Sequence, residues 1–114
     1  MRSLFVTATE YRGMICKSVQ LPGTRSSDYD KVVSMLGAKN ARIVGFIDDE
    51  HCIWAGNSHN ESTRPVFAIG RDQLSVNGPL LVTGFDQKDD RVIPASLTEA
   101  EFDTWNIEYT RMSA

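Results

Sequence analysis

The sequence predicts an α+β domain, with a mainly antiparallel sheet of about five to six strands and two helices packed on one face. Two observations predict this class. Short apolar stretches separated by tight turns follow one another along most of the chain, which is typical of hairpins. Residues 26–36 and 96–112 instead place apolar side chains at helical spacing behind capping residues. Helices of this kind bury one face against a sheet.

The clearest signals lie within Val76–Phe102. The pair Asn77 and Gly78 predicts a turn, because both residues tolerate a positive φ. The continuous apolar run Leu80–Val82 follows and predicts a central strand that is covered on both faces. A glycine inside a strand marks a bulge or a close approach of another backbone, and we expect one of these at Gly84.

A charged turn at residues 86–91 connects this strand to a short strand at Val92 and Ile93. Beyond it, Ser96 and Glu99 have the spacing of a capping box. Apolar residues then recur every three or four positions, at Phe102, Trp105, Tyr109 and Met112. The pattern predicts a second helix over residues 96–112 whose apolar face packs on the sheet.

The N-terminal third predicts a strand pair followed by the first helix. Residues 3–9 and 14–21 alternate in polarity, as strands with one buried face do. Residues 26–36 begin at a capping serine, Ser27, and carry an apolar stripe at helical spacing. Gly37 follows and suits the left-handed residue that ends many helices.

The middle of the chain predicts a hairpin, followed by one short segment that could be a strand or a helix. Residues 41–47 and 51–55 flank an acidic turn and read as two apolar strands. Residues 66–69 fit either a short strand or one helical turn. A sheet of this composition leaves an edge strand exposed, which would allow a homodimer.

Composition limits the function classes. The 114 residues predict a single domain, residues 1–114, and the 41% hydrophobic and 24% charged shares are ordinary for a globular protein. A net charge of −3 without a basic stripe argues against direct nucleic-acid binding. Neither a membrane span nor a signal peptide is expected. Cys16 and Cys52 are too few and too distant to suggest a secreted disulfide scaffold, so we expect a cytoplasmic protein.

Several segments also resemble, in this order, those of an uncharacterised family of short proteins from phages and plasmid-like elements, catalogued as a domain of unknown function. The segments that carry the resemblance are IVGFIDDEHCIWAG, HNESTR, VNGPLLVTGFDQKDD and SLTEAEF. The resemblance covers about Val19–Phe102, and the segment after Phe102 is longer than such proteins have. It implies an accessory protein that acts on host or rival-defence machinery, and it supplies no catalytic residues.

The acidic turn at residues 48–50 suggests a metal site, because His51, Cys52 and His59 follow it. The spacing matches no familiar metal motif, and neighbouring strand residues such as His51 and Cys52 point to opposite faces. We therefore expect an acidic turn with a solvated histidine, no metal and no cofactor. A small hydrolase built on His51 and His59 is the third functional hypothesis. Cys52 lies on an apolar strand and is expected to be buried rather than nucleophilic.

The longest polar stretch, Gly56–Arg64, offers many hydrogen-bonding side chains close together. Its candidate ligand-binding residues are Asn57, His59, Asn60, Thr63 and Arg64. An arginine is the natural anchor for an anion, so the second hypothesis is that this loop binds a small polar or anionic ligand.

Carboxylates gather in the last third of the chain and suggest a surface for a basic partner. The candidate partner-binding residues are Asp86, Asp89, Asp90, Glu101 and Asp103. Since catalytic signatures are absent, the leading hypothesis is a small non-enzymatic interaction protein. Together with the resemblance, this suggests a host or defence protein as the partner and inhibition as the role.

Overall fold

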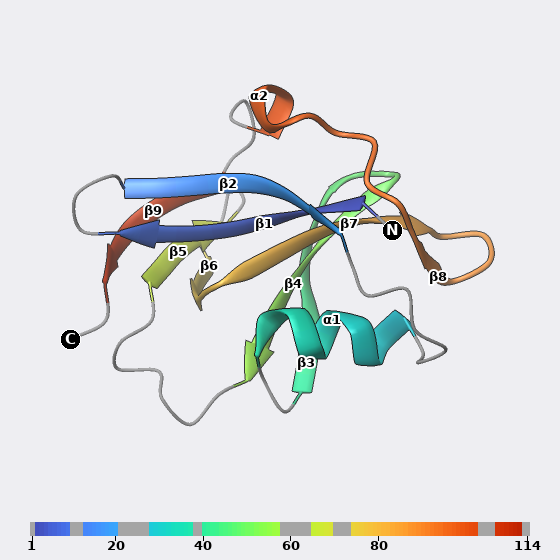
Figure 1. Ribbon diagram of the computed structural model, residues 1–114, viewed down its shortest axis with the longest axis horizontal. Coiled ribbons are helices and arrows are strands. Elements are labelled where there is room, and N and C mark those ends of the chain that lie inside the picture. Colours follow the sequence, from blue (N-terminus) through green and yellow to red (C-terminus); the bar gives the residue numbers. More distant parts are fainter. Residues whose placement is uncertain are drawn as a thin grey trace.

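Strand β7 is the central strand of a six-stranded antiparallel sheet with the order β2-β1-β7-β4-β3 (Figure 1). The sixth strand, β8, pairs with the same edge of β7 as β1 does, but farther along that strand. Strand β1 pairs with residues 80–82 and β8 with residues 84–86. A second, three-stranded sheet has the order β6-β5-β9. The α+β class, with a mainly antiparallel sheet of five to six strands and two helices, is therefore confirmed.

The computed structural model describes residues 2–9, 13–20, 28–37, 40–57, 65–69, 74–102 and 107–112. The strands are β1 (Arg2–Thr9), β2 (Gly13–Gln20), β3 (Asn40–Asp48), β4 (His51–Asn57), β5 (Pro65–Ile69), β6 (Leu74–Asn77), β7 (Leu80–Asp86), β8 (Arg91–Ile93) and β9 (Ile107–Met112). The helices are α1 (Asp28–Leu36) and α2 (Glu99–Phe102). Residues 66–69, which suited a strand or a helical turn, are thus a strand. In the described part of the chain, no helix has the length and apolar character needed to cross a membrane.

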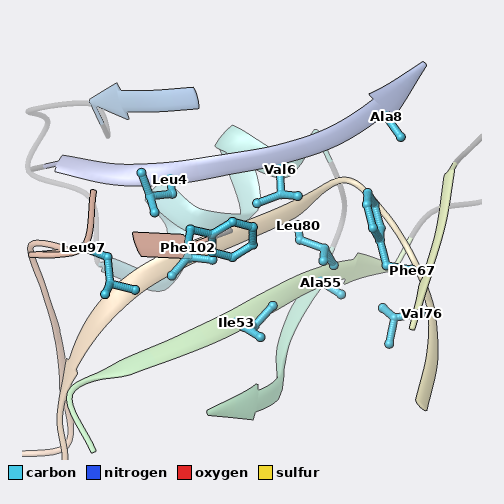
Figure 2. Packing of buried hydrophobic residues seen from close by; sticks show 11 residues of the cluster. Leu4, Val6, Ala8, Ile53, Ala55, Phe67, Val76, Leu80, Leu97 and Phe102 are labelled. Atoms are coloured by element: carbon cyan, nitrogen blue, oxygen red, sulfur yellow. The ribbon is translucent and has the colours of Figure 1, made fainter. Parts of the chain in front are cut away.

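The large sheet is buried on both faces, because alternate side chains of β4 and β7 enter two different clusters. The first cluster lies between the large sheet and the small sheet and comprises Leu4, Val6, Ala8, Ile53, Ala55, Phe67, Val76, Leu80, Val82, Leu97 and Phe102 (Figure 2). The second lies under α1 and comprises Val32, Leu36, Cys52, Trp54, Leu81 and Val92. Leu80, Leu81 and Val82 are each 0% exposed, which confirms the predicted central strand.

The two helices lie on opposite faces of the large sheet, whereas the sequence suggested one shared face. Helix α1 places Val32 and Leu36 in the second cluster. It ends at Gly37, whose φ is +64°, as the predicted helix end requires. Helix α2 places Phe102 in the first cluster, and Figure 1 shows the two helices on either side of the sheet.

The predicted second helix is wrong beyond Phe102. Residues 107–112 form β9, which pairs antiparallel with β5. The apolar spacing from Phe102 to Met112 fits a helix, but Ile107 to Thr110 also alternates in polarity and is rich in strand-favouring residues. The available partner strand decides between the two patterns, since pairing satisfies backbone groups along β9 and extends the small sheet.

The capping box also lies two residues later than predicted. The Thr98 hydroxyl accepts from the Glu101 amide at 3.1 Å, and a Glu101 carboxylate oxygen accepts from the Thr98 amide at 3.2 Å. Thr98 and Glu101 have the same box spacing as Ser96 and Glu99, so spacing alone could not choose between them. Ser96 and Glu99 are instead used in contacts with distant strands.

Candidate functional site

The β3–β4 and β7–β8 turns are built in the same way. A carboxylate oxygen of Asp48 accepts from the Glu50 amide at 2.8 Å. A carboxylate oxygen of Asp86 accepts from the Lys88 and Asp89 amides at 3.0 and 3.2 Å. Each turn therefore begins with an aspartate whose side chain accepts hydrogen bonds from turn amides. The first role of this aspartate is to stabilise the turn.

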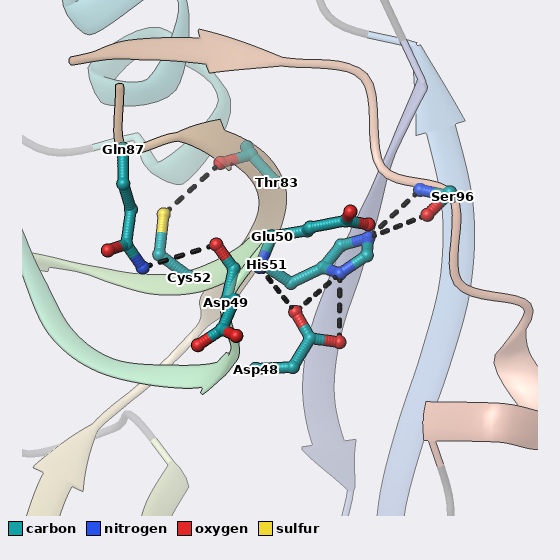
Figure 3. A network of polar contacts seen from close by, with 8 residues as sticks. All are labelled: Asp48, Asp49, Glu50, His51, Cys52, Thr83, Gln87 and Ser96. Carbon is teal, nitrogen blue, oxygen red and sulfur yellow. Dashed lines mark hydrogen bonds and ion pairs between the residues drawn. The ribbon is translucent and has the colours of Figure 1, made fainter. Parts of the chain in front are cut away.

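Hydrogen bonds hold these two turns side by side at one end of the large sheet. The Phe85 amide donates to the Glu50 carbonyl at 2.7 Å. The Gln87 side chain donates to the Asp49 carbonyl at 3.1 Å (Figure 3). We call residues 48–50 and 86–91 the acidic end. Its six carboxylates are Asp48, Asp49, Glu50, Asp86, Asp89 and Asp90, and its two basic side chains are Lys88 and Arg91. The resulting charge of −4 is larger than the −3 of the whole chain.

Phe46 lies beside the acidic end and is 52% exposed. Among the side chains that the structure describes, no other large hydrophobic one is exposed. Its ring meets that of Phe85 edge-on, with centroids 5.8 Å apart and an interplanar angle of 75°. This edge-to-face geometry is favourable for aromatic pairs. An apolar side chain therefore stands at the border of a strongly acidic surface.

His51 connects the β3–β4 turn to the segment between β8 and α2. Its Nδ1 atom lies 3.0 and 3.2 Å from the two carboxylate oxygens of Asp48. Its Nε2 atom lies 3.0 Å from the amide nitrogen of Ser96 and 3.1 Å from the Ser96 hydroxyl oxygen (Figure 3). The side chain is only 3% exposed. The prediction of a solvated histidine is therefore wrong, because a distant loop covers the ring.

The contacts of His51 fix which ring nitrogen holds the proton. An amide N–H can only donate, so Nε2 must be the unprotonated, accepting nitrogen. The proton of the neutral ring is then on Nδ1 and is donated to Asp48. Partial burial of Asp48 on its own would raise the pKa of its carboxyl. The hydrogen bonds from the Glu50 amide and from His51 outweigh burial and hold that pKa below its usual value.

Gly84 explains why Ser96 can reach His51. Gly84 pairs with His51 of β4 on one side and with Ile93 of β8 on the other. A Cβ atom at Gly84 would lie 2.4 Å from the Pro94 carbonyl oxygen and 2.8 Å from a side-chain carbon of Ile93. The close packing point predicted at Gly84 is confirmed, since only a glycine lets the chain after β8 cross this face of the sheet.

A second set of hydrogen-bonded side chains is buried under α1. Trp54 donates its indole N–H to the Thr83 hydroxyl at 3.0 Å, and the Cys52 sulfur lies 3.5 Å from the same hydroxyl. Burial raises the pKa of the Cys52 thiol. Cys52 is 0% exposed, as predicted, and Cys16 packs against the other cluster, so the two sulfurs lie on opposite faces of the sheet.

An ionic group lies beyond Ser96, where α2 approaches β2. Arg2 donates to the Ala95 carbonyl at 2.9 Å and to the Ser18 hydroxyl at 3.2 Å. Glu99 accepts from the Ser18 amide at 2.9 Å. The hydrogen bond from this amide and the nearby positive charge of Arg2 lower the pKa of the Glu99 carboxyl. Glu99 therefore caps the amide of a strand, not its own helix.

The structure brings only some of the predicted site residues together. Asp86, Asp89 and Asp90 share the β7–β8 turn, where Asp90 adopts a φ of +54°. Glu101 lies on α2, away from that turn in Figure 1, and takes part in the capping box. Asp103 lies outside the described residues.

The ligand-binding loop is almost wholly outside the described part of the chain. Asn57 ends β4, paired with Asn40 of β3, whereas His59, Asn60, Thr63 and Arg64 fall within residues 58–64, which the structure does not describe. The anionic-ligand hypothesis and the role of His59 therefore stay predictions. Within the described ranges, no group of three or more histidine, cysteine, aspartate or glutamate side chains could hold a metal ion.

No family model, curated protein or solved structure matches this chain. The site must therefore be interpreted from its own geometry. The link that sequence reasoning missed is that of His51 with Ser96, 45 positions apart. Its only local signal is Gly84, which predicts that another backbone crosses the sheet without saying which one.

Proposed function

We propose that this chain is a small interaction protein that docks on a basic surface of a partner protein through its acidic end. The observation that favours this function most is the position of Phe46. It combines an exposed aromatic side chain with the −4 charge of the neighbouring turns. Aromatic residues surrounded by polar groups are typical anchors of protein interfaces, and a charged rim increases the rate of association with an oppositely charged surface.

The exposed carboxylates of this surface are those that do not build the turns. Asp49, Glu50, Asp89 and Asp90 are exposed, whereas Asp48 and Asp86 are partly buried and accept turn amides. The proposal therefore assigns docking to Phe46 and to these exposed side chains. Two copies of the chain would bring like charges together in a symmetric contact at this end, so a basic partner fits better than a second copy.

The resemblance to phage and plasmid proteins supports a host or defence protein as the partner, and inhibition of that protein as the consequence. We place the protein in the cytoplasm. Cys16 and Cys52 form no disulfide and lie on opposite faces of the sheet, as is compatible with a reducing compartment.

Neutralising the exposed turn tests the proposal. Partners captured from a bacterial host lysate would be identified by mass spectrometry and purified, and binding kinetics measured at low and high salt. We expect Asp89→Asn with Asp90→Asn to slow association about tenfold at low salt, with a smaller effect at high salt. Asparagine also tolerates the positive φ of Asp90, so the turn should be kept.

The matched control adds the same charge elsewhere. Gln20→Lys with Ser34→Lys raises the net charge by two units, as the aspartate pair does, at exposed positions on β2 and α1. Phe46→Ala should weaken binding about tenfold or more through faster dissociation. If the lysine pair slows association as much as the asparagine pair, only overall charge matters. Docking through the acidic end is then refuted.

A further inference from the structure

We propose that Ser96 is a nucleophile activated by His51, and that it reacts with activated acyl donors such as aryl esters and thioesters. The basis is the hydrogen-bonded order hydroxyl, imidazole and carboxylate, formed by Ser96, His51 and Asp48 (Figure 3). This is the arrangement that lets a histidine accept a hydroxyl proton while a carboxylate stabilises the charge that the ring then gains. The activity would be additional to docking.

The distances suit proton transfer at both ends of the ring. The Ser96 hydroxyl lies 3.1 Å from Nε2, and the Asp48 carboxylate lies 3.0 Å from Nδ1. Because the Ser96 amide also donates to Nε2, the neutral ring must present its lone pair toward Ser96 and its proton toward Asp48. The ring is thus held in the tautomer that a general base needs.

Ser96, His51 and Asp48 differ in how far they are exposed to solvent. Ser96 is exposed at the surface, whereas His51 is 3% exposed and the Asp48 side chain 35%. Ser96 therefore lies at the surface, where an acyl donor can approach it, while the base behind it is shielded from water. The ring cannot turn away, since it is hydrogen-bonded on both sides and covered by the chain that crosses Gly84.

The reaction balances without any further reagent except water. The Ser96 oxygen attacks the carbonyl carbon of the ester, and its proton passes to Nε2 of His51. The carbon–oxygen bond of an aryl ester, or the carbon–sulfur bond of a thioester, then breaks, and the departing phenolate or thiolate takes the proton from Nε2. Water then attacks the acyl-serine, gives a proton to Nε2 and releases the acid, and the proton returns to Ser96.

The shared acceptor on His51 limits the substrate class. The Ser96 amide and the Ser96 hydroxyl both lie within hydrogen-bonding distance of Nε2, so the hydroxyl proton must compete with the amide for one lone pair. A general base whose lone pair is shared in this way suits substrates whose leaving group departs readily, such as a nitrophenolate or a thiolate. Amides and peptides, whose leaving groups need protonation, should not react.

The test uses two probes on the full chain. The first is a fluorophosphonate, with peptide mapping by mass spectrometry to locate the adduct. We expect labelling of Ser96 and not of Ser18 or Ser34, which are also exposed but have no histidine contact in the described structure. The second probe is p-nitrophenyl acetate, whose hydrolysis should fall at least tenfold in Ser96→Ala. That variant keeps the Ser96 amide, and hence its hydrogen bond to His51.

Two variants separate activation from structure. His51→Gln should lower the rate of adduct formation about a hundredfold, within the usual range for loss of a general base. Asp48→Asn should lower it about tenfold, and it serves in place of His51→Gln should circular dichroism show that the latter does not fold.

The proposal is overturned if Ser96 stays unlabelled under conditions that label a serine esterase in the same tube. Equal labelling of Ser96 and Ser18, or an Asp48→Asn rate equal to the natural one, also overturns it. The contacts of His51 would then serve only to hold the β8–α2 segment on the sheet. Asp89→Asn with Asp90→Asn leaves this group untouched, so failure here and failure of docking are distinguished.

Discussion

At the residue scale, the side chain of His51 holds the distant segment between β8 and α2 in place on the sheet. Its ring accepts from Ser96 and donates to Asp48, and it shares a sheet face with Ile53 of the first cluster. A buried ring with both nitrogens satisfied avoids the penalty of burying an unpaired polar group. The same contacts that support the fold also create the arrangement from which nucleophilic chemistry at Ser96 is inferred.

The lowered pKa of Asp48 makes stability depend on pH. A carboxyl whose pKa is lower in the folded than in the unfolded state, about 3.9, stabilises the fold fully above the unfolded value. This contribution is lost as pH falls through the folded pKa. We expect the difference in unfolding free energy between the natural protein and Asp48→Asn to be constant near neutral pH. It should shrink below about pH 4.

Urea unfolding from pH 3 to pH 7 measures this difference directly. Asp89→Asn is the control, because that exposed side chain has no turn amide or histidine to stabilise its charged form in the described structure. A difference between natural protein and Asp48→Asn that stays constant down to pH 3 would contradict the assignment.

At the element scale, the close crossing of β8 and the following segment over β7 requires Gly84. In Gly84→Ala the new Cβ would meet backbone and side chain at 2.4 to 2.9 Å, and Ile93 cannot move away without opening its pairing with Gly84. We expect a loss of about 3 kcal/mol or more, at or above the upper end of ordinary overpacking. Chemical denaturation would measure it.

Gly37 is the matched control for this substitution. Its φ is +64°, but a Cβ there would meet nothing within 4 Å. Gly37→Ala should therefore lose only the 1 to 2 kcal/mol, roughly, that a left-handed conformation costs an ordinary residue. Equal losses in the two variants would show that the crossing at Gly84 is not tightly packed.

At the scale of the whole molecule, prediction from sequence succeeded where the signal was local. The hairpin around the β3–β4 turn, the end of α1 at Gly37 and the buried run at Leu80–Val82 depend on neighbouring residues. The contacts that assemble the candidate site join distant residues. Arg2 and Ala95 are 93 positions apart, and turn chemistry contains no information about such pairs.

The helix predicted for the C-terminal segment was wrong for the same reason, because its structure depends on a distant strand. Its apolar residues fit a helix and a strand almost equally, and the choice depends on β5, which offers a free edge to pair with. Which carboxylates share an end of the molecule also followed from topology. The β7–β8 turn meets the β3–β4 turn because β7 and β4 are neighbours in the sheet, whereas α2 sits elsewhere.

The role of β9 in the whole fold is open to a direct test, in which the chain is ended after Asn106. If residues 107–112 pair with β5, their removal exposes one edge of a sheet whose Phe67 is 0% exposed in the first cluster. Each lost backbone hydrogen bond contributes about 0.5 to 1.5 kcal/mol, so the unfolding free energy should fall by several kcal/mol. Hydrogen exchange should then quicken in β5 and β6 before it quickens in β7, which is paired on both edges within the other sheet. A shortened chain with natural stability and unchanged exchange in β5 would show that β9 adds nothing to the fold.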